Sequence, residues 1–171
     1  MKGLEKLSAL QRRLTPVACA HWLIELVRAR TGSYRVAALW VDQKGPYPAI
    51  DGVECWNRER DAVKYAGPWP IIAHPPCGPW GRYRANCKQD RRDGIIAMEL
   101  VHRFGGVVEQ PQTSRLFREH GQPFAEYTQF PLALFGFACL KPTTIYMWWL
   151  TPPEDKQPPA AATALPRCTS A

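Results

Sequence analysis

Residues 70–80 read Pro-Ile-Ile-Ala-His-Pro-Pro-Cys-Gly-Pro-Trp. The stretch opens with a short apolar run of the kind that forms a buried β-strand, and it stops at two successive prolines. Proline fixes the backbone angle φ and has no N–H donor, so the pair holds the chain stiffly just before Cys77. In α/β proteins, strand ends are where catalytic and ligand-binding groups are usually found. Cys77 is therefore predicted to be a presented thiol, either a nucleophile or a ligand.

A second apolar strand is predicted at residues 107–111, Val-Val-Glu-Gln-Pro. Between the two strands, apolar residues recur at helical spacing over 93–104, and a Gly-Gly pair ends that helix. A strand–helix–strand pattern over 70–111 is typical of a right-handed βαβ crossover. Such a crossover brings Cys77 and Glu109 to the same edge of a parallel sheet.

The remaining segments predict the rest of an α/β fold. Helices are expected over 4–14 and from about 16 to 30, with Thr15 capping the second. Residues 35–41 predict a central strand and residues 53–56 a short one. Two antiparallel strands around a turn are expected at 128–137 and 141–150. The predicted fold is a Rossmann-like three-layer sandwich with a mostly parallel sheet and antiparallel C-terminal strands.

The length of 171 residues and an apolar content of 46% fit one domain with a genuine core. We expect a single α/β domain over 1–150, including an N-terminal helical segment (1–32). Proline, alanine and polar residues dominate 151–171, which predicts a disordered tail. The chain opens on a charged amphipathic segment and has no apolar run near the ~20 residues of a membrane span. These features predict a cytoplasmic protein with mostly free thiols and no membrane partner.

The net charge of +7 favours an anionic partner, DNA or a nucleotide. The most basic window follows Cys77, where Arg82 and Arg84 alternate with the aromatic residues Trp80 and Tyr83. This mixture suits phosphate contact and base stacking, and a solvated polar loop is the alternative.

A thiol and a carboxyl group at one sheet edge suggest a particular chemistry. Thiolate is the reactive form of cysteine, and His74, Arg82 and Arg84 are candidates to lower the pKa of Cys77. A carboxylate facing the sulfur would raise that pKa, so Glu109 is expected to face a substrate. A pyrimidine is attacked at C6 by a thiolate while a carboxyl group contacts N3, and the adduct becomes nucleophilic at C5.

Three motifs occur in order: Pro75-Pro76-Cys77, Glu109-Gln110-Pro111, and Phe135-Gly136 with Lys141-Pro142-Thr143. Over about residues 70–150 the chain resembles cytosine-5 DNA methyltransferases, and more specifically short phage and prophage methylase-like proteins. The resemblance implies that Cys77 is the nucleophile and that Glu109 contacts the flipped base. It also implies DNA as substrate, S-adenosyl-L-methionine as methyl donor, and a phage or prophage origin in a bacterial host cell.

The remaining site residues follow from this resemblance and from position. Cofactor contacts are expected from Asp42, Gly45 and Pro75. The predicted substrate-binding side chains are His74, Arg82, Arg84, Gln110 and Lys141. Gln110 stands where the family usually has an asparagine that braces the backbone. The family's glycine-rich first turn and its Gln-x-Arg-x-Arg motif are not visible, and Glu54, Glu59 and Asp61 are candidates for a ribose-binding carboxylate.

Several alternatives remain open. Cys77 could be a small buried residue, or could join His74 and Cys87 in a zinc site, although no metal is predicted because the cysteine spacing departs from known signatures. Glu109 could cap the turn at 113–114, and Lys141 could be a turn residue rather than a phosphate contact. For the whole protein, the alternative is a non-catalytic or altered-cofactor descendant that binds DNA, a nucleotide or a host defence component.

Overall fold

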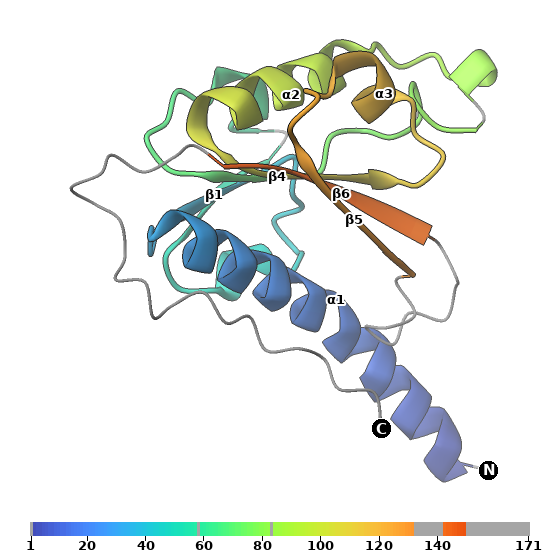
Figure 1. The fold of residues 1–171 in the computed structure, drawn as a ribbon. Coiled ribbons are helices and arrows are strands. Elements are labelled where there is room, and N and C mark those ends of the chain that lie inside the picture. The colour runs from blue at the N-terminus through green and yellow to red at the C-terminus, as the bar shows by residue number, and fades with distance from the viewer. Residues whose placement is uncertain (1, 58, 83, 132–141, 150–171) are drawn as a thin grey trace.

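The computed structural model describes residues 2–57, 59–82, 84–131 and 142–149, with the backbone alone at 2–15, 130 and 131 (Figure 1). Its strands are β1 (Val36–Leu39), β2 (Val53–Trp56), β3 (Ile71–Ala73), β4 (Gly106–Pro111), β5 (Glu126–Pro131) and β6 (Pro142–Trp148). Its helices are α1 (Lys2–Thr31), α2 (Arg92–Phe104) and α3 (Leu116–His120), with short 3-10 turns η1 (Tyr47–Ala49), η2 (Ala62–Lys64) and η3 (Arg84–Asn86).

The six strands form one sheet in the order β2-β1-β3-β4-β6-β5. The first four are parallel, and β6 runs antiparallel to both β4 and β5. This confirms the predicted α/β class and the mostly parallel sheet with antiparallel C-terminal strands.

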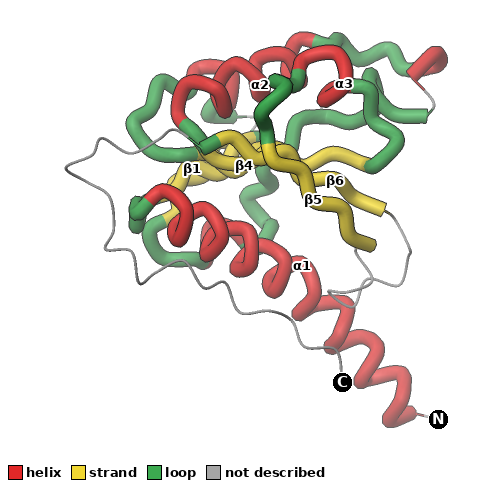
Figure 2. Tube along the Cα trace, in the orientation of Figure 1, coloured by secondary structure: helices red, strands yellow, loops and turns green. Residues whose placement is uncertain are grey.

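Helices cover both faces of the sheet, with α1 on one side and α2 and α3 on the other (Figures 1 and 2). Alternate residues of the strands enter two separate cores. Leu39 and Ala73 pack on the α2 side, whereas Ala38 and Ile72 pack on the α1 side. Since both faces are covered, the central strands are apolar throughout rather than alternating with polar residues.

The N-terminal segment differs from the prediction, because α1 is one continuous helix with Pro16 inside it. Thr15 is therefore not an N-cap. Proline removes one backbone hydrogen bond and crowds the preceding turn, which usually ends a helix. Here the half of α1 after the proline is held by the sheet, since Leu23, Ile24 and Val27 are completely buried. Tertiary packing outweighs the local breaker.

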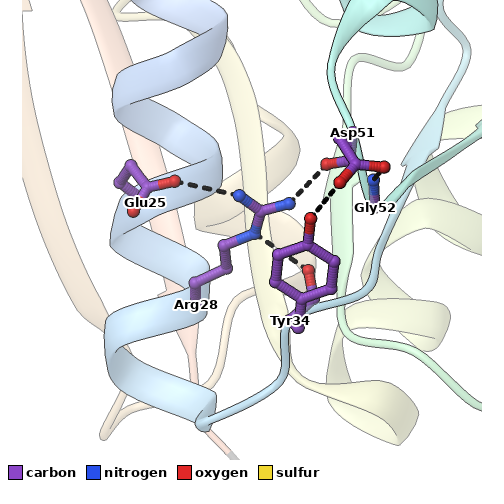
Figure 3. A network of polar contacts seen from close by, with 5 residues as sticks. All are labelled: Glu25, Arg28, Tyr34, Asp51 and Gly52. Carbon is purple, nitrogen blue, oxygen red and sulfur yellow. Dashed lines mark hydrogen bonds and ion pairs between the residues drawn. The ribbon is translucent and has the colours of Figure 1, made fainter.

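An arginine near the end of α1 joins the helix to the amino-terminal edge of the sheet (Figure 3). Arg28 contacts Glu25 at 3.0 Å and donates to the backbone carbonyls of Tyr34 at 2.9 Å and Asp51 at 2.6 Å. The Tyr34 hydroxyl donates to the Asp51 carboxylate, and this bond raises the pKa of the phenol and lowers that of the carboxyl group. These contacts lie at the opposite end of β1 from its carboxyl end, which faces the candidate site.

The predicted crossover is present as β3-α2-β4, with Ile71 opposite Gly106 and Ala73 opposite Val108. Gly105 and Gly106, with φ of 74° and 117°, end α2 and start β4. The backbone of Gly106 lies so close to that of Ile71 that an added Cβ would stand 2.7 Å from the Ile71 nitrogen. A glycine is required there both for conformation and for space.

The order of strands creates a crevice between β1 and β3. The chain leaves β1 for β2 on one side and then returns to β3 on the other. The two connections cover opposite faces, since Tyr47 of η1 joins the α1-side core and Ala62 of η2 joins the α2-side core. Sheets with this kind of reversal bind ligands at the carboxyl ends of the two strands.

Within the described ranges, no helix is both long and apolar enough to cross a membrane. The predicted tail at 151–171, the Phe135-Gly136 pair and Lys141 lie outside those ranges.

Candidate functional site

Two pockets open at the carboxyl ends of β1 and β3, and they share a wall made by Trp40, Val41, Asp42 and His74. The α1-side pocket has a volume of about 320 Å³ and is lined further by Pro16, Cys19, Ala20, Gly45, Pro46, Tyr47, Glu109, Thr143 and Ile145. The α2-side pocket, about 540 Å³, is lined further by Asn57, Asp61, Ala62, Val63, Pro76, Gln89 and Asp93.

The fold brings four of the predicted site residues together. Asp42, Gly45, His74 and Glu109 all line the α1-side pocket, although they come from three separate parts of the chain. A tight turn places the first two, because the Gly45 N–H donates to the Asp42 carbonyl at 2.9 Å. The Lys44 N–H donates to the Asp42 carboxylate, also at 2.9 Å. The grouping of these residues follows from the parallel strand order.

His74 lies at the centre of this group. Its Nε2 is 2.7 Å from the Tyr47 hydroxyl, and its Nδ1 is 3.3 Å from Oε2 of Glu109. Its backbone N–H donates to the Leu39 carbonyl at 3.1 Å, which continues the pairing of β3 with β1 beyond the strand. The imidazole predicted to bind substrate is thus held between a phenol and a carboxylate.

Sequence reasoning missed three residues of the α1-side pocket. Tyr47 is buried, and this burial raises the pKa of its phenol well above the ordinary value. Burial, with a contribution from the charge of Glu109, raises the pKa of the Cys19 thiol to about 11. Thr143 is fully buried, and its hydroxyl has no hydrogen-bond partner among the described residues. Tyr47 carried a signal in the sequence, as an aromatic residue between two prolines, and Thr143 belongs to the Lys141-Pro142-Thr143 motif, but neither was assigned to the site.

Cys77 lies three residues beyond His74, in a turn closed by its own carbonyl. That carbonyl accepts hydrogen bonds from the N–H groups of Trp80 at 3.1 Å and Gly81 at 2.9 Å. The turn is anchored by the Trp80 ring, which is completely buried and packs against Gly94 of α2. The thiol is free and half-buried, and it lines neither of the two pockets.

Gln110 connects the turn of Cys77 to the strand of Glu109. Its side chain is 1% exposed, and its amide nitrogen donates to the Pro75 carbonyl at 2.7 Å. Its amide oxygen accepts from the Ser114 hydroxyl at 3.1 Å. Gln110 was predicted to bind substrate and Pro75 to bind cofactor, whereas here their polar groups bond to protein. Gln110 therefore braces the turn of Cys77 against β4.

Replacing Gln110 by methionine, which has a similar shape, is expected to lower the free energy of unfolding by about 2 kcal/mol. The change leaves the buried Pro75 carbonyl without its donor. Gln112 provides a matched control, since its amide bonds to Gln129 at an exposed position, and Gln112→Met should change stability by less than about 0.5 kcal/mol. Urea denaturation of both variants measures the difference. Equal stabilities would show that the brace contributes nothing.

The basic window after Cys77 is only partly as predicted. Arg82 is exposed, and Arg84 donates to the Gly81 carbonyl at 3.4 Å. Both lie on the loop that follows the thiol. Trp80 was expected as a stacking surface for bases, but this is wrong, because the ring is a core residue and Arg91 covers it at 4.8 Å. Tyr83 lies outside the described residues.

The contacts of Glu109 and Cys87 bear on two alternatives, a turn cap at Glu109 and a zinc site that includes Cys87. Glu109 faces His74, and the turn at 113–114 is bonded through Ser114 to Gln110 and to the Leu116 N–H. Cys87 lies beside Gly78, where an added Cβ would be 2.8 Å from its sulfur. Within the described part of the chain, no three His, Cys, Asp or Glu side chains are grouped as metal ligands.

One of the three candidate ribose-binding carboxylates reaches a pocket. Asp61 lines the α2-side pocket, and with φ of 57° its carboxylate accepts from the Val63 N–H at 3.3 Å and is paired with exposed Lys64 at 3.4 Å. Glu54 is paired with Arg60 at 2.5 Å, and Glu59 is exposed.

The carboxyl edge of the sheet thus carries a thiol, a carboxylate held by a histidine, and two pockets that meet at His74. A thiol is a group that can attack an electrophilic ring covalently, and a carboxyl group is one that can transfer a proton to it, although the thiol lines neither pocket. Comparisons with protein-family models, curated proteins and solved structures find no match to this chain.

Proposed function

We propose that this chain is a phage-type DNA cytosine-5 methyltransferase-like enzyme that uses the Cys77 thiolate on a pyrimidine base. The observation that carries the proposal is the hydrogen bond from Gln110 to the Pro75 carbonyl. It joins the residue after Glu109 to the turn that presents Cys77, so the nucleophile and the carboxyl group are held at the ends of neighbouring parallel strands.

In the proposed reaction Cys77 forms a C–S bond to C6 of cytosine, and Glu109 delivers a proton to N3. The electron pair of the C5–C6 double bond is then available at C5. S-adenosylmethionine, when bound, would supply the methyl group to C5 and leave as S-adenosylhomocysteine. Loss of the C5 proton to solvent and release of the Cys77 thiolate restore the double bond, and the N3 proton returns to Glu109.

The α2-side pocket is the site that we propose for the methyl donor. Asp61 offers a carboxylate for ribose hydroxyls, and Trp40 offers an aromatic side chain for adenine. Of the predicted cofactor residues, Asp42 lines this pocket, whereas Gly45 lines the α1-side pocket and Pro76 takes the place of Pro75. The volume, about 540 Å³, is within the range of small-molecule sites.

Calorimetric titration should detect S-adenosylmethionine binding, and Asp61→Asn should weaken it about tenfold by removing the charge that accepts from the ribose. Glu59→Gln makes a similar charge change at an exposed site that does not line the pocket, so its affinity should equal that of the wild type. No heat at millimolar cofactor would contradict methyl transfer, and equal losses in both variants would contradict this placement.

The positive charge supports DNA as the substrate. The net charge is +7, and Arg82 and Arg84 lie on the loop that follows the proposed nucleophile. Arginines so placed would hold the phosphates on either side of a base presented to Cys77. A cytoplasmic location in a bacterial host and a phage or prophage origin are part of the same proposal.

DNA that contains 5-fluorocytosine tests the proposal directly. Fluorine at C5 cannot leave as a proton does, so an adduct with Cys77 would persist after methyl transfer. Incubation with this DNA and S-adenosylmethionine should give a complex that survives denaturing electrophoresis.

The second candidate, a non-catalytic or altered-cofactor descendant, is favoured by the absence of Cys77 from both pocket linings. It predicts DNA or nucleotide binding without any adduct.

A further inference from the structure

We infer that Tyr47 and His74 are a positioning pair for Glu109, in which the Tyr47 hydroxyl donates to His74 Nε2 and the His74 Nδ1–H holds one carboxylate oxygen. The inference rests on the proposed function for its purpose, since it is Glu109 that would meet the base. The hydrogen-bonding arrangement itself stands on the geometry and can be tested without any activity.

The direction of the two hydrogen bonds follows from the chemistry of the partners. Oε2 of Glu109 is the acceptor, and the proton that Glu109 delivers to N3 is carried on Oε1, so the 3.3 Å contact requires a hydrogen on His74 Nδ1. In a neutral imidazole Nε2 then carries no hydrogen and becomes an acceptor. The Tyr47 hydroxyl, 2.7 Å away, is the donor that completes the chain.

Tyr47 is well suited to fix this tautomer. It is 6% exposed, and the raised pKa of its phenol keeps the hydroxyl protonated and able to donate. Pro46 precedes it at the start of η1, which restricts the backbone. Its ring lies 5.5 Å from the His74 ring at an interplanar angle of 49°.

The backbone on which the pair stands is also fixed. His74 is bonded through its N–H to the Leu39 carbonyl, and the next residue, Pro75, accepts from Gln110. Consecutive residues of β4, Glu109 and Gln110, thus contact consecutive residues at the end of β3. A carboxyl group that is held this way through one oxygen lines the α1-side pocket in one orientation, which is what proton delivery from the other oxygen to a bound ring requires.

Two other ionisable groups, Cys19 and Asp42, line the α1-side pocket with the pair, and Cys55 also lies near Tyr47. Cys19 of α1 stays a neutral thiol, because its pKa is raised to about 11. Asp42 lines the same pocket from the loop after β1. It belongs to the tight turn described above, where its carboxylate accepts from the Lys44 N–H.

Nitrogen-15 spectra of histidine-labelled protein at pH 8 test the inference, because they distinguish a ring nitrogen that carries hydrogen from one that does not. His74 is expected to show the Nδ1–H tautomer in the wild-type protein. In Tyr47→Phe, which keeps the buried ring, the His74 signals should indicate a mixture of the Nδ1–H tautomer and the commoner Nε2–H tautomer. Loss of the His74 signal in His74→Gln gives the assignment.

The chain contains a matched control, since His102 Nε2 lies 2.6 Å from the Tyr146 hydroxyl. Tyr47→Phe should leave the His102 signals unchanged, and Tyr146→Phe should change His102 without changing His74. An Nε2–H tautomer of His74 in the wild-type protein, or a His74 signal unaffected by Tyr47→Phe, would overturn the inference. The wild-type spectrum decides the matter even if a variant does not fold.

The functional consequence is measured separately. With 5-fluorocytosine DNA, Tyr47→Phe should form the adduct about tenfold more slowly than the wild type at equal DNA affinity, because Glu109 is less well oriented. Unchanged adduct kinetics together with the expected tautomer change would overturn the positioning role. If the wild-type protein gives no adduct, the proposed function fails, and the spectra still decide whether the pair exists.

Discussion

Replacement of Cys77 by serine is expected to abolish the covalent complex with 5-fluorocytosine DNA and leave DNA affinity unchanged. A serine hydroxyl is far less acidic than a thiol and supplies almost no anion at neutral pH, so C6 is not attacked. The exchange of sulfur for oxygen removes little volume from a half-buried position, and the turn is held by backbone bonds from Trp80 and Gly81. Denaturing electrophoresis and fluorescence anisotropy with the same labelled DNA give the two readouts.

Cys87 supplies the control for this experiment. It is a free, half-buried thiol next to Gly78, and therefore close to the same turn. Cys87→Ser should form the complex as the wild type does. An adduct that survives in Cys77→Ser but disappears in Cys87→Ser would show that Cys87 is the nucleophile, and the assignment of Cys77 would be wrong. DNA binding by both variants with no adduct in any form of the protein would favour the non-catalytic descendant.

Replacement of Gly106 by alanine is expected to lower the free energy of unfolding by about 4 kcal/mol or more, which is a large part of the stability of a domain of this size. The new Cβ would overlap the backbone of Ile71 in the neighbouring strand. Ile71 cannot move aside, since its N–H is bonded to the Gly105 carbonyl at 3.0 Å and β3 lies between two strands. A φ of 117° adds strain for any residue other than glycine.

Gly32→Ala separates the clash from the strain. Gly32 follows α1 with φ of 68°, and an added Cβ there would meet no atom within 4 Å. The loss of stability should be about 1 to 2 kcal/mol, the cost of a left-handed conformation alone. Chemical denaturation of the two variants tests the difference. Similar losses in Gly106→Ala and Gly32→Ala would mean that β3 and β4 can separate at little cost.

The crossover was predictable from sequence because its signals are local and agree with one another. Two short apolar runs, a helix of regular periodicity and a Gly-Gly stop suffice to define β3, α2 and β4, and the parallel pairing then follows from chain connectivity. Cys77 and Glu109 were located by the same reasoning, the first in the turn that follows β3 and the second within the carboxyl-terminal half of β4.

Other features could not be read from local pattern. A proline inside α1 is a strong breaker, and only burial of Leu23, Ile24 and Val27 against the sheet shows why the helix continues. Trp80 lies among arginines in the sequence, so its burial was not apparent. The cavity that receives it exists because Gly94, fourteen residues later, has no side chain.

The order of residues was enough to place a thiol and a carboxyl group at one edge of a parallel sheet, because periodicity and turn chemistry are properties of short segments. Tertiary structure alone brought Tyr47 to His74, formed the two pockets and turned the Gln110 amide onto the Pro75 carbonyl. Those contacts depend on which face each side chain takes and on how strands pair across the reversal at β1. Interactions between segments distant in the chain set both, and no local pattern encodes them.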